Sequence, residues 1–145
     1  MKNQGFSLLE LMLVMVIVAL FACFAYPGYR ESLTRARRID GQTALLDLAA
    51  KMEQYYAQQQ TYEGATLGIG SQSELISSNR SAQNFYDLVI TKQTPEEFSL
   101  RAIPRDSQGR DDKACQTLGL NSAGIKTVNF GPAGSPSSNV NHCWH

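Results

Sequence analysis

Glu10 is the residue near the start of the chain with the clearest chemical consequence, because it is an acid inside an otherwise apolar stretch. Apolar residues continue without a break from Leu11 to Tyr26. A carboxylate at the centre of a bilayer costs about 2.5–3.5 kcal/mol on insertion scales, so it is rarely kept without a partner. The nearby sequence supplies none. The pattern therefore predicts that the partner comes from another molecule and that the chain assembles.

The three cysteines form a second chemically informative set. Cys23 lies in the apolar run, where a thiol usually behaves as a small buried hydrophobe. Cys115 and Cys143 flank a polar, glycine-rich segment, and their pairing would close a loop of about 29 residues, worth about 3–4 kcal/mol. We predict this disulfide. Because it needs an oxidising compartment, we expect the domain to face the periplasm or the cell exterior.

The C-terminus also offers a metal alternative, because His142, Cys143 and His145 are crowded there. No second cluster completes four zinc ligands, so we predict no metal site. The two histidines stand at the end of the chain, and no serine or cysteine nucleophile has a visible base. The sequence therefore predicts a structural building block without a cofactor, not an enzyme.

DNA contact is a further candidate chemistry, which would need clustered cations to release counterions from phosphates. Four basic residues are candidates for such a strip: Arg101, Arg105, Arg110 and Lys113. Three acids interrupt it: Asp106, Asp111 and Asp112. The pair at 111–112 is expected in a turn, with its charge in solvent. The whole chain has 13 Lys and Arg against 13 Asp and Glu, so no global field favours nucleic acid. We expect weak DNA binding at most.

The N-terminal segment must position Glu10. Counted from Phe6, the apolar segment reaches roughly the ~20 residues that span a bilayer. A cleaved secretory signal is the alternative, but Ala22–Ala25 is only a weak small-x-small site. We predict a retained transmembrane helix over residues 6–29, bent or locally opened by Pro27. The arginines at 30–38 would favour a cytoplasmic head by the positive-inside rule. The predicted disulfide argues for the opposite orientation, because it needs an oxidising compartment. We give it more weight and predict that the head lies outside the cytoplasm.

The helical pattern continues beyond the membrane segment. Apolar residues recur at three- and four-residue steps through residues 30–60, including Leu33, Ala36, Leu45 and Met52. Such a stripe indicates an amphipathic helix. Joined to the apolar part, it predicts one helix of about 55 residues, about 80 Å long at 1.5 Å per residue. Its second half should pack on a sheet.

The remainder of the head, which spans residues 30–145, reads as a loop followed by strands. Residues 61–84 are predicted to be a connecting loop, with at most a turn of helix at 73–76. Strand signals alternate through 85–130, interrupted by a polar loop at 104–113. Residues 131–145 predict an irregular region tethered by Cys143. Four antiparallel strands on a long helix make an α+β domain.

The start of the chain carries a family resemblance. Gly5-Phe6-Ser7-Leu8-Leu9-Glu10, followed by the apolar run and Pro27, resembles the type IV prepilin leader. The resemblance implies that prepilin peptidase removes residues 1–5 by cutting between Gly5 and Phe6, and that the new Phe6 amine is methylated. It also implies that Glu10 meets the Phe6 amine of a neighbouring subunit, which turns two costly charges into one pair. A single-pass anchor with a chance acid is the alternative.

The second half of the chain resembles a minor-pilin subgroup that includes small pilins of twitching, attachment and DNA uptake. The matching positions are Thr61-Tyr62, Phe85-Tyr86, Ser107-Gln108, Asp112, Cys115, Leu118, Leu120, Gly124 and Cys143-Trp144. The resemblance implies the type IV pilin fold, with a disulfide-bounded C-terminal region and an exposed connector.

The function implied is that of a pilus subunit, minor or major, which assembles through its apolar helix. Its expected partners are other pilins, prepilin peptidase, the inner membrane and the pilus assembly machinery. The expected location is the inner membrane before assembly and the extracellular filament afterwards. Two alternatives stay open: a DNA receptor for natural transformation and a type II secretion pseudopilin. The predicted C-terminal disulfide loop counts against the pseudopilin.

Overall fold

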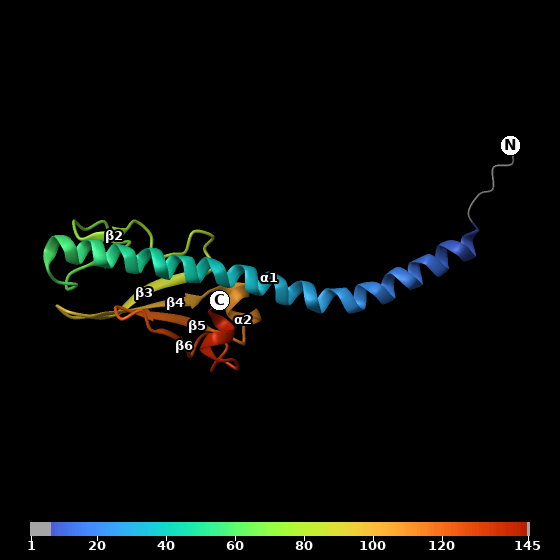
Figure 1. The fold of residues 1–145 in the computed structure, drawn as a ribbon. Coiled ribbons are helices and arrows are strands. Elements are labelled where there is room, and N and C mark those ends of the chain that lie inside the picture. Colours follow the sequence, from blue (N-terminus) through green and yellow to red (C-terminus); the bar gives the residue numbers. More distant parts are fainter. Residues whose placement is uncertain (1–6, 145) are drawn as a thin grey trace. The chain divides into compact units, whose positions relative to one another are not determined.

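A computed structural model describes residues 7–144 of the chain (Figure 1). Its first element is helix α1, Leu8–Gln59, which has 52 residues. The chain divides into two compact units, Met1–Arg35 and Ala36–His145. The first unit contributes the apolar part of α1, and the second contains the rest of α1 and all the strands.

The apolar part of α1 exposes its side chains along its whole length. Leu8 is 76% exposed and Phe24 is 82% exposed, although both are large and apolar. A window of this helix has a mean hydropathy of 2.8, and α1 is long and apolar enough to cross a membrane. Exposed apolar surface of this extent needs a lipid or protein environment. The predicted leader, residues 1–5, and Phe6 lie outside the described residues.

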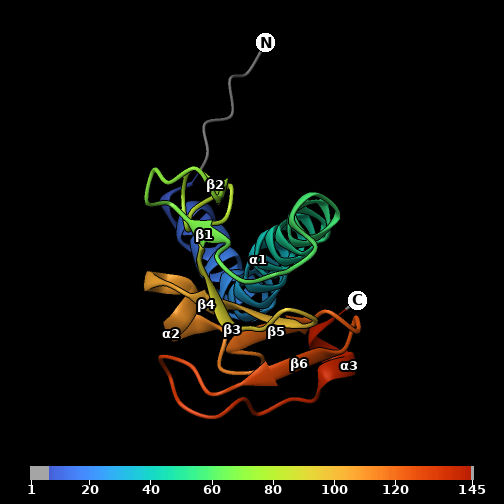
Figure 2. The same ribbon diagram turned by 90° about the vertical axis from the view of Figure 1, so that its left-hand side faces the viewer.

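The second unit is a helix packed on a sheet, as the sequence predicted (Figure 2). The sheet has the order β3-β4-β5-β6, and every neighbouring pair is antiparallel. Its strands are β3 (Tyr86–Gln93), β4 (Phe98–Pro104), β5 (Thr117–Asn121) and β6 (Lys126–Asn129). Strand β4 alternates strictly, so that Phe98, Leu100 and Ala102 are buried while Arg101 is exposed on the opposite face. We call that opposite face the outer face of the sheet.

The buried stripe of α1 differs from the predicted one at its start. Leu33 and Ala36 are exposed, so their predicted place in the stripe was wrong. The stripe instead begins with a charged residue and follows three- and four-residue steps: Arg38, Gly41, Leu45, Leu48 and Met52. An apolar pattern cannot reveal this beginning, because a tertiary ion pair buries Arg38.

Gly41 is a position where α1 lies close against Tyr86 of the sheet. A Cβ atom added there would lie 2.8 Å from Cδ2 of Tyr86, a ring that is fully buried. We expect Gly41→Ala to lower the free energy of unfolding by about 1–3 kcal/mol, because overpacking outweighs the better helix propensity of alanine.

Thermal unfolding of the full-length protein in detergent micelles measures this change. Gly28→Ala is the matched control, since nothing lies within 4 Å of a Cβ added to that helical glycine. Head stability that is unchanged or increased in Gly41→Ala would contradict the predicted clash.

The connector at 61–84 contains regular structure that the sequence did not indicate. Strands β1 (Thr66–Leu67) and β2 (Glu74–Ile76) pair in parallel. The turn of helix predicted at 73–76 was therefore wrong. Gly68 and Gly70 adopt positive φ, which lets the chain turn back so that the Gly68 N–H donates to the Ile76 carbonyl at 2.9 Å.

The prediction of a polar loop at 104–113 was also wrong, because this segment contains helix α2, Asp106–Asp111. Gln108 of this helix is fully buried, and its Nε2 donates to the Tyr86 hydroxyl at 3.0 Å. The C-terminal region holds a third helix, α3 (Val140–Cys143), where Asn139 caps the start by accepting from the His142 N–H. Both short helices depend on contacts with the rest of the head, because helices of this length are not stable in isolation.

Candidate functional site

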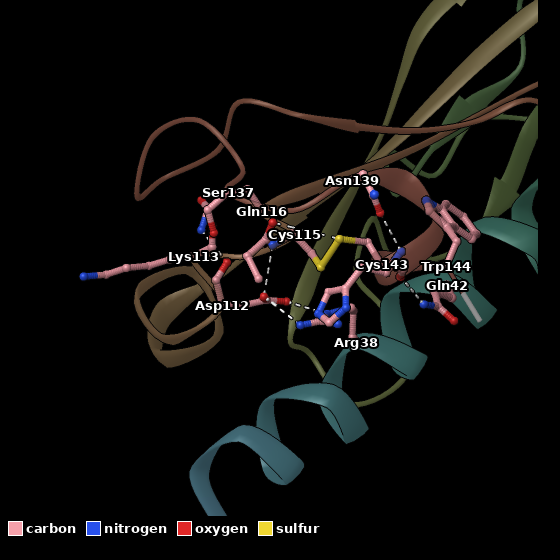
Figure 3. The surroundings of a disulfide bond; sticks show 12 residues. Arg38, Gln42, Asp112, Lys113, Cys115, Gln116, Ser137, Asn139, Cys143 and Trp144 are labelled. Atoms are coloured by element: carbon pink, nitrogen blue, oxygen red, sulfur yellow. Dashed lines mark hydrogen bonds and ion pairs between the residues drawn. A yellow bond between two sulfur atoms is a disulfide. The ribbon is translucent and has the colours of Figure 1, made fainter. Parts of the chain in front are cut away.

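The disulfide joins the C-terminal segment to the end of the α2 region (Figure 3). Cys115 and Cys143 are bonded, with their Cα atoms 5.5 Å apart, and both are fully buried. The Cys143 carbonyl also accepts a hydrogen bond of 2.6 Å from Nε2 of Gln42 on α1. The disulfide therefore lies inside the core, and α1 contacts the C-terminal segment directly. Cys23 is free and exposed on the apolar helix.

Asp112 lies at the centre of a buried polar network beside the disulfide (Figure 3). The Arg38 guanidinium donates to its two oxygens at 2.8 and 2.9 Å, in a bidentate arrangement. The Gln108 amide and the Cys115 N–H also donate to this carboxylate. Its side chain has no exposed surface. The expectation that Asp112 is solvated in a turn was wrong.

Gln116 links this network, through hydrogen bonds, to the later loop that contains Ala133. It has φ of +44°, in the left-handed region that most residues avoid, and it is fully buried. Its Nε2 donates to the Asp112 carbonyl, and its Oε1 accepts from the Ala133 N–H at 3.0 Å. Sequence reasoning missed this residue, because one glutamine in a polar stretch carries no signal.

The four predicted DNA-contacting cations fall into two places. Three of them lie in α2 or next to its ends: Arg105, Arg110 and Lys113. Arg101 instead lies on the outer face of the sheet, opposite Gly119 of β5. Arg105 is half-buried and forms an ion pair with Asp87 at 3.3 Å. The other three cations are exposed and form no ion pair with any residue that the structure describes.

Beyond the arginine cluster at 30–38, charge is divided unevenly along the chain. Residues 39–97 contain three Lys and Arg against eight Asp and Glu, whereas residues 98–145 contain five against three. Of these last three acids, Asp112 is neutralised by Arg38, which leaves Asp106 and Asp111 exposed. The positive excess is thus concentrated on the later strands and the α2 region.

Two arginines of the cluster at 30–38 belong to the head. Arg38 pairs with Asp112, and Arg37 donates from Nη1 to the Ser107 hydroxyl at 3.1 Å. The Arg37 guanidinium also lies 4.8 Å from the centre of the Phe85 ring. Because these two charges bind inside the folded head, they are poor indicators of membrane orientation.

Two tyrosines of the core, Tyr62 and Tyr86, have hydroxyl groups whose pKa is raised. Burial and a hydrogen bond to Glu53 raise the pKa of Tyr62 to about 12. Burial also raises the pKa of Tyr86, whose hydroxyl accepts from Gln108. Both side chains therefore stay neutral at physiological pH and add no negative charge to the head.

The assembly residues predicted from the leader are only partly described. Glu10 is exposed in the first turn of α1. Gly5 and Phe6 lie outside the described residues. Helix α1 is helical at residue 27, and the kink at Pro27 stays a prediction.

Comparison with known protein families matches residues 1–119 of the 145. Residues 27–119 match the family described as type IV minor pilin ComP, DNA uptake sequence receptor. The chain belongs to this family. Residues 1–26 match the prokaryotic N-terminal methylation motif. The chain is a minor type IV pilin, which bears out the pilin resemblance of both its start and its second half.

Individual relatives of this minor pilin come from both pili and secretion systems. Type II secretion system core protein G of Klebsiella pneumoniae is 27% identical over 139 residues, which cover 95% of this chain and 91% of the relative. The type IV major pilin protein PilA of Myxococcus xanthus is 28% identical over 69 residues, covering 48% of this chain and 31% of the relative.

A solved structure supports the fold of the minor pilin. The crystal structure of the Neisseria meningitidis non-core minor pilin PilV aligns with a TM-score of 0.52 and 23% identity. The alignment covers 74% of this chain and 98% of that chain. At this identity the likeness concerns the fold, a long helix packed on an antiparallel sheet.

Proposed function

We propose that this minor pilin captures DNA at the surface of a type IV pilus during DNA uptake. The observation that carries the proposal is the state of Asp112. In the sequence this acid interrupts the basic strip, but in the fold it is buried and paired with Arg38. Arg110 and Lys113 on either side of it remain exposed and unpaired within the described chain. Cations in this state are available to replace counterions on DNA phosphates.

The family description supports the same assignment, since the matched family is named for a DNA uptake sequence receptor. From sequence alone, DNA reception was the second of three hypotheses because three acids interrupted the cations. With Asp112 neutralised, the exposed cations Arg101, Arg110 and Lys113 outnumber the exposed acids Asp106 and Asp111. Arg105 is a weaker candidate because Asp87 already binds it.

Assembly follows from the leader in this proposal. Prepilin peptidase cuts between Gly5 and Phe6, and the Phe6 amine is methylated. Before assembly the subunit is anchored in the inner membrane with its head in the periplasm. Pro27 allows the membrane helix to bend. On docking, Glu10 binds the Phe6 amine of a neighbouring pilin, and the subunit leaves the bilayer for the extracellular filament. The methylation-motif match and the exposed acid on an apolar helix support this sequence of events.

A secretion pseudopilin is the second candidate function. It is favoured by the alignment with core protein G over 95% of this chain. The family match over residues 27–119 and the disulfide-bounded C-terminal region favour the pilin. Deleting the gene should therefore reduce DNA uptake and leave protein secretion unchanged; the reverse result would favour the pseudopilin.

Charge removal tests the DNA proposal directly. We expect the triple variant Arg101→Gln, Arg110→Gln, Lys113→Gln to bind duplex DNA more weakly. Its slope of log affinity against log salt should fall by about 0.9 for each phosphate that the variant no longer neutralises. Fluorescence anisotropy with full-length protein in micelles, over a range of salt concentrations, measures both quantities.

Lys51→Gln is the control, because Lys51 pairs with Asp47 on the acidic half of the head. This variant should bind DNA as the unmodified protein does. An unchanged affinity and salt slope in the triple variant would refute a DNA site at these cations.

A further inference from the structure

A cleft of about 450 Å³ lies between α1 and the end of the connector, within the head. Its walls are largely apolar, and they include Ala44 of α1, Ile76 and Ala82 of the connector and Leu88 of β3. Two acids of α1, Asp40 and Asp47, also line it. The cleft is separate from the basic residues assigned to DNA.

Asp40 is the unusual member of this lining. Its side chain is buried, with only 9% of the residue exposed. Oδ1 accepts a hydrogen bond of 3.1 Å from the Gln83 N–H. Oδ2 has no hydrogen-bond partner, and the carboxylate forms no ion pair with any other described residue. A buried charge in this state costs free energy that a cation would recover.

The cations that line the same cleft are already engaged elsewhere. Lys51 lies 3.7 Å from Asp47, and Arg80 lies 3.9 Å from Asp87. Neither forms an ion pair with Asp40. The cleft therefore has one carboxylate, Asp40, in excess, and charge complementarity calls for a cation from outside the chain.

We propose that this cleft receives a lysine side chain from a neighbouring pilin subunit in the filament. The apolar walls suit the four-carbon stem of lysine, while the ammonium reaches Asp40. Only one oxygen of Asp40, Oδ2, lacks a partner, and a single ammonium donor satisfies it, whereas a guanidinium presents a fork that binds best to both oxygens of a carboxylate. The proposal rests on filament assembly and is independent of DNA binding. Glu10 and Asp40 would then behave alike, because each is an acid that gains an amine partner when the subunit docks into the filament.

Photo-crosslinking in intact filaments tests the proposal. A photoreactive amino acid replaces Ser78, an exposed residue of the cleft, and the captured peptide is identified by mass spectrometry. We expect a lysine-containing peptide of another pilin molecule. Asp40→Asn, which keeps the acceptor for Gln83, should reduce capture at least ten-fold. Replacing the captured lysine by glutamine should have the same effect, and combining the two changes should add little.

Two controls keep the result interpretable. Glu63→Gln removes an exposed acid outside the cleft and should leave capture unchanged. Asp40→Asn should retain the Cys115–Cys143 disulfide and normal thermal unfolding, so that lost capture is not lost folding. In cells blocked in pilus assembly, the monomer should capture nothing.

Several results would overturn the proposal. These are no captured pilin peptide in filaments, a captured peptide without lysine, unchanged capture in Asp40→Asn, and equal capture from unassembled monomers. A DNA-binding assay on Asp40→Asn separates this proposal from the other one, since the affinity for duplex DNA should not change.

Discussion

Glu10→Ala should remove the protein from filaments while leaving its head folded. If Glu10 binds the Phe6 amine of a neighbour, the change discards an ion pair that is formed only on assembly. A loss of about 3 kcal/mol of pairing corresponds to more than a ~100-fold drop in incorporation. The ratio of this protein in sheared filaments to that in membranes, measured by immunoblotting, gives the effect. Glu10→Gln should behave similarly, because it keeps the shape and removes the charge.

Glu31→Ala is the matched control for this experiment. Glu31 is also an acid of α1, but it is exposed and only 3.5 Å from Arg35, a pair of the surface type that contributes about 0–1 kcal/mol. It should enter filaments normally. Normal incorporation of Glu10→Ala would refute the pairing role of Glu10.

Arg38→Ala should give the largest loss of head stability. It removes the bidentate partner of Asp112 and leaves that carboxylate buried, with Gln108 and the Cys115 N–H as the remaining donors to its side-chain oxygens among residues 7–144. Breaking a buried ion pair in this way costs about 3–5 kcal/mol. Chemical denaturation of the full-length protein in micelles measures the change. The α2 region should also become susceptible to proteolysis, because Arg38 holds it to α1.

Two further variants separate the pair from its surroundings. Arg35→Ala removes a neighbouring arginine whose side chain is 54% exposed, and it should change stability by less than about 1 kcal/mol. The double variant Arg38→Met, Asp112→Leu should be more stable than Arg38→Ala, because no unpaired charge remains in the core. Equal stability of Arg38→Ala and Arg35→Ala would show that the buried pair has little energetic role.

Features of the chain that depend on local pattern were predictable. The long helix follows from an apolar run joined to a three- and four-residue stripe, and the observed α1 is Leu8–Gln59. The four strands follow from alternation, which β4 shows strictly. The fold prediction also included a disulfide-bounded C-terminal region, and the structure joins Cys115 to Cys143. In each case neighbouring residues carry enough information to predict the element.

The errors at Asp112, Gln108 and helix α2 share one cause, which is that polar residues were assigned to solvent. Asp112 and Gln108 lie in a charged, hydrophilic stretch, yet both are buried by partners on α1 and β3. Those partners are 74 and 22 residues away. No local periodicity reports a contact at that distance, and the same reason hid helix α2.

The amino-acid sequence by itself determined the long apolar helix, the class of fold and the membership in the pilin family, since these depend on residue order over short distances. Tertiary structure alone decided which charges face solvent. It buried Asp112 against Arg38 and left Arg110 and Lys113 exposed. It also buried Asp40 beside a cleft whose cations, Lys51 and Arg80, pair with other acids. The physical reason is that the availability of a charge depends on its desolvation and its partner, and packing across the fold sets both.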